Sequence, residues 1–329
     1  MALNWKIDEC GAYHDRMRLS GWAFQAAPRI TRIEAVFPDP AAVVPLRSYG
    51  LASPDVAAGV DPAATHARFD EWISAPPEAL GYDFALRFTF QDGTTATGGS
   101  ALGNATAGDP YFGSFVNFIS QLGAFPSGTV LEIGSRARSA LTNRQHIPPH
   151  LDYVGLDILP GPNVDVVGDA HRLADIFAGR RFVAAMSFSV FEHLAMPWKV
   201  ALELNRVLEP GGLVYSQTHH TWPLHEEPWD FWRFSQHSWQ TLFNAATGFE
   251  VVQAVCGEPA RIHACRSNPV TRDLPNFRNA YLGSASIVRK ISDTALSWPV
   301  PVEVAARDSY PAGELAAPPI HPVNAFQRA

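Results

Sequence analysis

One stretch decides the fold expected for this chain: Thr129-Val-Leu-Glu-Ile-Gly134-Ser-Arg-Ala-Arg-Ser139. Its apolar residues predict a short buried strand, and Gly134 permits a sharp turn where that strand ends. Glu132 lies inside the apolar run, where a carboxylate is costly unless it meets hydrogen-bond donors. A buried strand that ends in a tight turn is typical of the nucleotide-binding crevice of an open α/β sheet.

The chain beyond this stretch continues the pattern of an α/β domain. Apolar runs predict further strands at 151–157, 164–173 with its exit loop, 182–194 with its exit turn, 213–218, 249–255 and 284–289. Helical spacing predicts helices over 112–122 and 198–208, and a third that Ser235 caps and Gly248 stops.

Residues 1–105 have a different pattern, that of short strands and tight turns. Strands are predicted at 17–24, 30–37 and 82–90, with a hairpin turn at 91–93 and a returning strand at 94–97. This pattern predicts an N-terminal all-β sandwich domain. Trp22 and Trp72 are more readily core residues than stacking platforms for a glycan or a partner, because large aromatic side chains mostly bury.

The composition bounds the remaining possibilities. With 329 residues, 47% of them hydrophobic and 17% charged, the chain is expected to hold packed domains. We divide it into a β-sandwich at 1–105, an α/β domain at 106–293 and an irregular Pro/Ala-rich tail at 294–329, with a linker at 98–108. The net charge of −7 excludes a basic nucleic-acid footprint, and three scattered cysteines exclude a disulfide framework. Without a signal peptide or a membrane span, a cytoplasmic location is expected.

The stretch at 129–139 resembles motif I of the class I S-adenosylmethionine-dependent methyltransferases. Glu132 and Gly134 match the family pattern, whereas Arg136 and Arg138 replace its second and third glycines. Later motifs follow in the family's order, among them the Leu-x-Pro-Gly-Gly sequence at 208–212. The resemblance implies a Rossmann-like, seven-stranded sheet whose last strand is antiparallel. Arg136 then either grips the cofactor's carboxylate or marks a site that has lost the cofactor.

The resemblance also implies which residues bind S-adenosylmethionine. Asp157 ends the second strand about 20 residues after the glycine turn, where such folds place the acid that binds ribose hydroxyls. Asp169 and the Ala170 amide correspond to the loop that reaches the adenine, and His171 is expected at its rim. The full predicted set comprises Glu132, Gly134, Ser135, Arg136, Asp157, Ile158, Asp169, Ala170, Ser187 and Ser189.

The segment 219–235 is the least generic part of the chain and follows a predicted strand end, where acceptors bind in this fold. Its aromatic and charged residues suit a sugar, through stacking on ring faces and hydrogen bonds to hydroxyls. The predicted acceptor-binding residues are Trp222, Trp229, Asp230, Trp232 and Arg233, and the candidate bases are His193, His219, His220 and His225. Two alternatives stay open. Asp230 and Arg233 can be an internal pair that packs a lid, and the histidines with Glu226 can bind a metal. The missing HxH and HExxH spacing disfavours a metal site, and none is predicted.

The sequence therefore predicts a methyltransferase that uses S-adenosylmethionine, with a sugar or polysaccharide-type acceptor. The Asp-Phe-Trp-Arg-Phe run at 230–234 is similar to one in methyltransferases often placed near surface-polysaccharide genes. The rival hypotheses are a catalytically inactive protein of this fold that binds a glycan or a protein, and a methyltransferase for small molecules or lipids. The expected partner is a small-molecule or glycan acceptor, and the oligomeric state is left open.

Overall fold

The computed structural model describes residues 2–13, 16–38, 41–74, 83–137, 142–260, 262 and 280–306. The chain forms two compact units, one that comprises Met1–Ala107 and one that begins at Gly108. Each unit has a hydrophobic core of its own. Within the described ranges, no helix is both long and apolar enough to cross a membrane.

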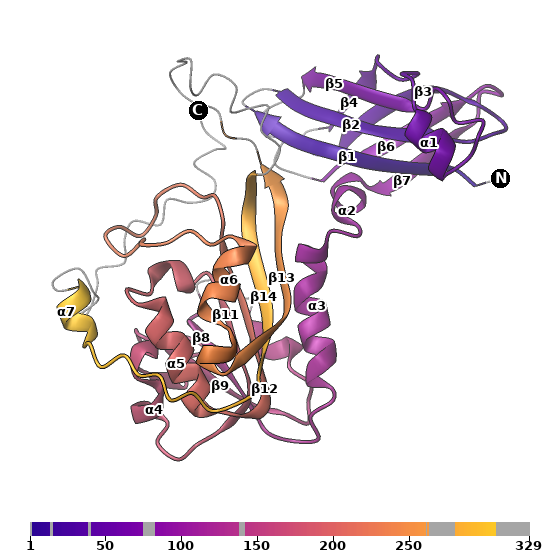
Figure 1. Ribbon diagram of the computed structural model, residues 1–329. Helices are drawn as coiled ribbons and strands as arrows, with labels where there is room; N and C mark the ends of the chain where they lie inside the picture. Colours follow the sequence, from indigo (N-terminus) through magenta and orange to yellow (C-terminus); the bar gives the residue numbers. More distant parts are fainter. Residues whose placement is uncertain are drawn as a thin grey trace. The chain divides into compact units, whose positions relative to one another are not determined.

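The N-terminal unit consists of two antiparallel sheets, as predicted (Figure 1). The three-stranded sheet comprises β1 (Asn4–Tyr13), β2 (Arg16–Phe24) and β5 (Arg68–Ser74). The four-stranded sheet comprises β4 (Ala41–Leu46), β3 (Ile30–Pro38), β6 (Ala85–Phe90) and β7 (Thr95–Ser100). Alternate side chains of both sheets, such as Leu19 and Phe88, share one core, so the unit is a β-sandwich. A short helix, α1 (Pro54–Gly59), precedes β5.

Two expectations for this unit are wrong. The glycine-rich stretch at 98–108 is not a free linker, because β7 extends to Ser100 and helix α2 (Ala101–Thr106) follows. A Cβ at Gly98 would lie 2.7 Å from the Trp5 ring, so this glycine serves close packing. Trp72 is not a core residue but is 48% exposed, since it belongs to the outward face of β5, whereas Trp22 is half-buried.

The second unit is built on a seven-stranded sheet in the order β10-β9-β8-β11-β12-β14-β13. Its strands are β8 (Thr129–Ile133), β9 (Asp152–Asp157), β10 (Val166–Val167), β11 (Phe182–Phe188), β12 (Leu208–His219), β13 (Phe249–Ala260) and β14 (Ala280–Lys290). β14 pairs antiparallel with both neighbours, whereas β8 to β12 pair in parallel. The Rossmann-like, seven-stranded α/β sheet is thus confirmed.

Helices cover both faces of this sheet (Figure 1). On one face, α3 (Pro110–Leu122) buries Phe118 and Leu122 in one core cluster. On the other face, α4 (Leu173–Ile176), α5 (Pro197–Val207) and α6 (Gln236–Leu242) belong to a second cluster. These apolar faces at helical spacing are what the sequence predicts.

The C-terminal helices differ from expectation. α6 ends at Leu242 instead of continuing to Gly248, because Asn244 caps a separate 3₁₀ turn over Ala245–Thr247. Gly248 then stops that turn with a φ of +82°. The expected irregular tail includes a short helix, α7 (Val302–Ala306), and its remainder at 307–329 lies outside the described residues.

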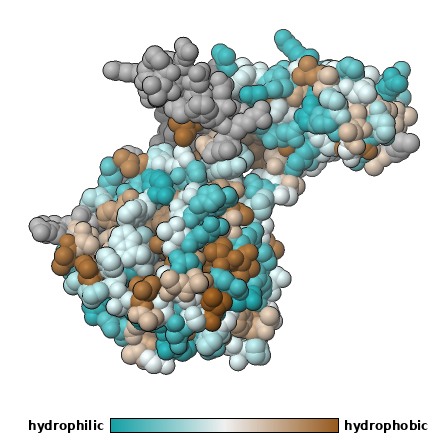
Figure 2. Space-filling model, viewed as in Figure 1, coloured by the Kyte–Doolittle hydropathy of each residue, from teal (hydrophilic) through white to brown (hydrophobic). Residues whose placement is uncertain are grey.

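The parallel strands β8, β9, β11 and β12 all point their carboxyl ends to one edge of the sheet. Segments that leave this edge carry most of the predicted site residues. On the face shown in Figure 2, hydrophobic residues form small scattered groups among hydrophilic ones.

Candidate active site

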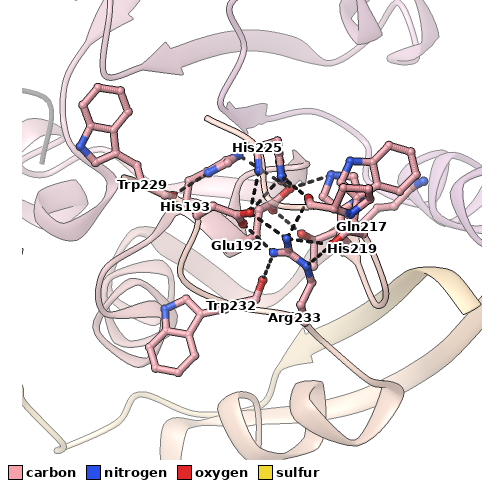
Figure 3. Close-up of polar contacts among 12 residues, drawn as sticks. Glu192, His193, Gln217, His219, His225, Trp229, Trp232 and Arg233 are labelled. Carbon is pink, nitrogen blue, oxygen red and sulfur yellow. Dashed lines mark hydrogen bonds and ion pairs between the residues drawn. The ribbon is translucent and has the colours of Figure 1, made fainter. Parts of the chain in front are cut away.

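A buried carboxylate surrounded by histidines lies beyond β11 and β12. The 3₁₀ turn Phe191–His193 follows β11 and buries Glu192 completely. Glu192 Oε2 accepts a hydrogen bond from the Thr218 hydroxyl. Its Oε1 faces three imidazole Nε2 atoms, at 3.9 Å in His193, 3.2 Å in His219 and 4.0 Å in His225 (Figure 3). We call these four residues the histidine–carboxylate cluster.

Two imidazoles of the cluster are held through their other nitrogen. His193 Nδ1 lies 2.7 Å from the Trp229 carbonyl oxygen, which can only accept, so Nδ1 carries the proton and donates it. His225 Nδ1 lies 3.3 Å from the Pro223 carbonyl oxygen, its hydrogen-bond partner, and 3.2 Å from Asp230 Oδ2. In the neutral tautomer that these contacts favour, both rings direct an Nε2 lone pair toward Glu192. His219 stacks on the Trp222 indole, with ring centroids 4.7 Å apart.

Burial shifts the pKa values of the cluster. Desolvation raises the pKa of Glu192 to about 7 and lowers the pKa of His219 to about 4. It also lowers the pKa of His193. The lowered pKa values favour neutral His193 and His219 imidazoles at pH 7. Glu192 Oε1 has no hydrogen-bond partner among the described residues, which is unusual for a fully buried carboxylate oxygen.

The segment 222–234 is closed by an internal ion pair. Arg233 donates to both oxygens of Asp230, at 2.5 and 2.7 Å, and also to the carbonyl oxygens of Trp222 and Pro223. The Asp230 side chain is 1% exposed, and Arg233 lowers its pKa to about 2 against the opposing effect of burial. The structure thus places these two predicted acceptor-binding residues in the internal pair that was the alternative.

The aromatic side chains of this segment differ in their direction. The indoles of Trp229 and Trp232 point away from Glu192 (Figure 3). Trp232 Nε1 donates to the Leu194 carbonyl oxygen at 2.8 Å, and its side chain is 38% exposed. Trp222 is 42% exposed and contacts the cluster through His219. The structure therefore brings the Trp222 indole to the cluster but not the indoles of the other two.

His220, a candidate base, also lies apart from the cluster. Its Nδ1 is 3.0 Å from Thr221 Oγ1, and its ring packs edge-on against Tyr281. Alternation along an extended strand explains this, because consecutive residues point to opposite faces. His219 therefore faces Glu192, whereas His220 does not.

The predicted cofactor residues lie at the ends of β8 and β9. Asp157 is nearly buried, and its Oδ1 and Oδ2 accept from the amides of Leu159 and Arg136, at 2.9 and 3.2 Å. A carboxylate oxygen has two acceptor sites, so each oxygen keeps one for a ligand. Ser135 Oγ and Arg136 Nε are buried without a hydrogen-bond partner among the described residues. Polar atoms with unused hydrogen-bonding capacity among the described residues therefore lie at this edge of the sheet.

Gly134 is required by its backbone and its surroundings. It has a φ of +76°, and a Cβ there would lie 2.2 Å from Val190 Cγ2. Ser187, also predicted, is buried at the end of β11, whereas Ser189 is exposed and Ile158 is half-buried.

Glu132 has internal partners instead of facing the crevice. Its carboxylate accepts from Asn143 Nδ2 at 2.7 Å and from the Tyr153 hydroxyl, and its pKa is raised by burial. Asn163 donates to the Tyr153 oxygen and to the Ser135 carbonyl oxygen, each at 2.9 Å. Glu132 therefore fixes the strand ends around the crevice.

The expectation that His171 lies at the rim is wrong. His171 is 1% exposed, its Nδ1 lies 2.7 Å from Asp169 Oδ1, and its Nε2 accepts from the Met196 amide at 3.2 Å. Buried polar groups need partners, and this ring satisfies two. Asp169 keeps Oδ2 for a ligand, and Ala170 is buried beside it.

Sequence reasoning missed Glu192, the centre of the cluster, and Thr218, which orients it. A signal was present, since Phe191-Glu-His-Leu194 places a carboxylate within a strand's apolar exit, as at Glu132. The same argument about costly buried charge applies to both.

Comparisons with known proteins agree with this picture of the second unit. Residues 109–254 match the profile of a family described as a methyltransferase domain. No curated protein sequence matches the chain.

Several solved structures cover the same region. The YcgJ protein from Bacillus subtilis is 16% identical, with 54% of this chain and 97% of that chain covered and a TM-score of 0.39. An S-adenosylmethionine-dependent methyltransferase from Archaeoglobus fulgidus is 15% identical, with coverages of 55% and 97% and a TM-score of 0.36. The Burkholderia thailandensis 1,6-didemethyltoxoflavin-N1-methyltransferase, solved with S-adenosylhomocysteine, is 12% identical, with coverages of 57% and 80% and a TM-score of 0.39.

Proposed function

We propose that the second unit, in which residues 109–254 match the profile of a methyltransferase domain, uses S-adenosylmethionine to methylate a hydroxyl oxygen of a sugar or polysaccharide-type acceptor. One observation carries the proposal. The crevice lies at the ends of β8 and β9, and the histidine–carboxylate cluster lies beyond β11 and β12, at the same edge of one sheet. β8 pairs directly with β11, so donor and proton acceptor can meet without a domain movement.

The crevice residues fit the implied cofactor. Asp157 keeps an acceptor site on each oxygen for the two ribose hydroxyls. Beside it, Ser135 Oγ and Arg136 Nε have no hydrogen-bond partner among the described residues, and Arg136 Nε lies 3.8 Å from Asp157 Oδ1, so both atoms can bind a charged ligand. Asp169 Oδ2 remains for an adenine amino group. Bound S-adenosylmethionine supplies an electrophilic methyl group on a sulfonium.

The cluster provides the proton acceptor. An acceptor hydroxyl must lose its proton as its oxygen attacks the methyl carbon. His219 is the member whose imidazole lies nearest Glu192, since its Nε2 is 3.2 Å from Oε1, and its side chain is partly exposed. The carboxylate behind the ring stabilises the imidazolium that forms, which is the role of the acid in a histidine-based triad. We assign His219 as the proton acceptor and Glu192 as the residue that stabilises it.

The sugar acceptor rests on the exposed indoles near the cluster. Trp222 is 42% exposed and stacks on His219, so an acceptor ring on this indole would lie next to the proton acceptor. Asp230 and Arg233 hold the segment in place and do not bind the acceptor in this proposal. A small-molecule or lipid acceptor is the second candidate, and the polar cluster makes it the weaker one.

The first test is calorimetric titration with S-adenosylhomocysteine. We expect micromolar binding by the wild type and a loss of more than about tenfold in Asp157→Ala, because two hydrogen bonds to a charged group disappear. Asp152→Ala is the matched control, since Asp152 is exposed at the other end of β9. Transfer of labelled methyl groups to a panel of sugars, small phenols and lipids then identifies the acceptor.

The rival hypothesis of an inactive binding module makes the opposite prediction. Arg136 Nε lies 3.8 Å from Asp157 Oδ1, where it can compete with the ribose. If the wild type does not bind S-adenosylhomocysteine but the variant Arg136→Gly with Arg138→Gly does, the enzyme proposal is wrong and the crevice has lost its cofactor.

A further inference from the structure

The arrangement of polar atoms in the histidine–carboxylate cluster favours a bound cation. Glu192 is fully buried and its Oε1 has no hydrogen-bond partner among the described residues. Imidazole nitrogens face this oxygen, and those of His193 and His225 present lone pairs when the rings are neutral, because their Nδ1 atoms lie against carbonyl oxygens. Lone pairs that face a carboxylate oxygen repel it unless a positive charge lies between them.

A proton can satisfy only part of this arrangement. One proton bridges one nitrogen to one oxygen, over at most about 3.2 Å. The distances from Oε1 to His193 and His225 are 3.9 and 4.0 Å, which is too long for a hydrogen bond. Two ligands bound at about 2.1 Å to one tetrahedral ion lie about 3.4 Å apart, so small side-chain movements would bring these atoms into a coordination sphere.

We propose that Glu192, His193 and His225 bind a divalent transition-metal ion. Their ligand atoms all lie within 4.8 Å of one another, and they combine two imidazole nitrogens with one carboxylate oxygen. This donor set suits Zn²⁺ and similar ions and leaves at least one position open. The proposal goes beyond methyl transfer and does not depend on it.

The surroundings support a preformed site. Metal-binding histidines usually donate their other N–H to a carbonyl or a carboxylate, which fixes the ring and raises its basicity. His193 does so to the Trp229 carbonyl oxygen and His225 to the Pro223 carbonyl oxygen, while Thr218 fixes the carboxylate of Glu192. Asp230 also accepts from the His225 backbone amide at 3.0 Å. Asp230 is held in turn by Arg233. The Asp230–Arg233 pair would thereby help to orient His225, one of the proposed ligands.

The open position would face the acceptor. His219 lies outside the three-ligand set, although its Nε2 is 3.2 Å from Glu192 Oε1. A hydroxyl bound to the ion would lose its proton more readily, because the ion stabilises the resulting alkoxide. His219 is placed to receive that proton. The ion and the proton acceptor would then have separate roles in one cluster.

The test is direct metal binding by the full chain. After treatment with a chelator and dialysis, Zn²⁺ is titrated by calorimetry, and Co²⁺ is added as a spectroscopic probe. We expect one Zn²⁺ per chain and visible Co²⁺ bands of a site with nitrogen and oxygen ligands. Glu192→Gln and His225→Gln should each weaken Zn²⁺ binding by more than about 100-fold, beyond the effect of an outer partner. His220→Gln is the matched control and should bind as the wild type does.

Several outcomes would overturn the proposal. They are the absence of stoichiometric Zn²⁺ binding by the wild type, a Co²⁺ spectrum of the free aqueous ion, or binding that persists in both ligand variants. Circular dichroism checks that each variant is folded. If a variant is unfolded, the wild type alone tests the proposal. Its Co²⁺ bands should appear and should be lost when Zn²⁺ is added. Titration with S-adenosylhomocysteine is independent of these readouts, so failure of the cofactor site and of the metal site are distinguished.

Discussion

At the scale of single residues, the chemistry of this chain depends on where charge is buried. Glu132, Asp157 and Glu192 all lie in or directly after strands of the same sheet, and all are buried. Their partners separate their roles. Glu132 accepts from two side chains, those of Asn143 and Tyr153, whereas Asp157 accepts from two backbone amides, and Glu192 Oε1 has no hydrogen-bond partner among the described residues. The kind of partner, more than the residue type, therefore distinguishes the carboxylate that joins strand ends from the two proposed to bind ligands.

The loss of the Glu192 charge should reduce catalysis without reducing cofactor binding. Glu192→Gln keeps the shape of the side chain but cannot stabilise an imidazolium or bind an ion. We expect the rate of methyl transfer to fall by about 10²–10⁴-fold, the usual contribution of acid–base catalysis. The affinity for S-adenosylhomocysteine should stay within about twofold of the wild type. Glu209→Gln, at an exposed carboxylate, is the control. Undiminished transfer by Glu192→Gln would remove the cluster from the mechanism.

The loss of the Tyr153 hydroxyl should reduce stability. Tyr153→Phe leaves buried Glu132 without one donor and Asn163 without one acceptor. An unsatisfied buried polar group costs about 1–3 kcal/mol, so the free energy of unfolding of the second unit should fall by that amount. Urea denaturation measures the change. Equal stability of the two proteins would mean that water replaces the hydroxyl.

At the scale of elements, the segment from Trp222 to Phe234 behaves as a folded strap. The Phe231 and Trp232 amides donate to the Glu192 carbonyl oxygen, and the Phe234 amide donates to the His219 carbonyl oxygen. Arg233 joins both halves of the strap through Asp230 and the Trp222 carbonyl oxygen. The strap therefore determines the position of His225 relative to Glu192.

Removal of Arg233 should loosen this strap. Arg233→Ala leaves the buried Asp230 carboxylate without its cation, and we expect a stability loss of at most about 3 kcal/mol, because Arg233 itself is partly exposed. Arg233→Lys should restore only part of it, since an ammonium cannot make the two-pronged contact. Limited proteolysis reports opening of the strap, and chemical denaturation reports the free energy. The double variant Arg233→Ala with Asp230→Asn should recover stability. If it does not, the buried charge is not the cause.

At the scale of the whole molecule, two units with separate cores share one chain. The sandwich core is formed by residues of the N-terminal sheets, and the clusters on the two faces of the seven-stranded sheet use residues from 111 onward. The residues of the crevice and of the histidine–carboxylate cluster all belong to the second unit. The stability of one unit should therefore be separable from the ligand binding of the other.

A cavity in the sandwich core tests this separation. Phe88 is fully buried there, and Phe88→Ala should destabilise the N-terminal unit by about 3–5 kcal/mol. Differential scanning calorimetry should show one transition moved to lower temperature while the other stays in place. The affinity for S-adenosylhomocysteine at 20 °C should be unchanged. A single shifted transition with weakened binding would mean that the units unfold together.

The sequence by itself determined the elements and their order. Strand β8 with its glycine turn, the buried faces of α3 and α5 and the antiparallel last strand follow from local periodicity, breakers and the resemblance. It placed Asp157 at a strand end for the same reason. The conformations of the glycine-rich stretch at 98–108 and of the chain after α6 could not be predicted from local sequence. They depend on contacts with residues elsewhere, such as the Trp5 ring against Gly98, and on the separate cap at Asn244.

Only the tertiary structure decided which side chains meet. Parallel pairing of Phe188 with Gln217 carries the exits of β11 and β12 to the same place, so residues 192, 193, 219 and 225 converge although no spacing in the sequence indicates a site. The missing HxH and HExxH spacing concerns residues close together in the sequence, whereas Glu192 reaches the histidines at 219 and 225 only through the packing of the sheet. Glu192 can act in the cluster because its carboxylate is buried, and burial is a property of the packed fold, not of the residue type.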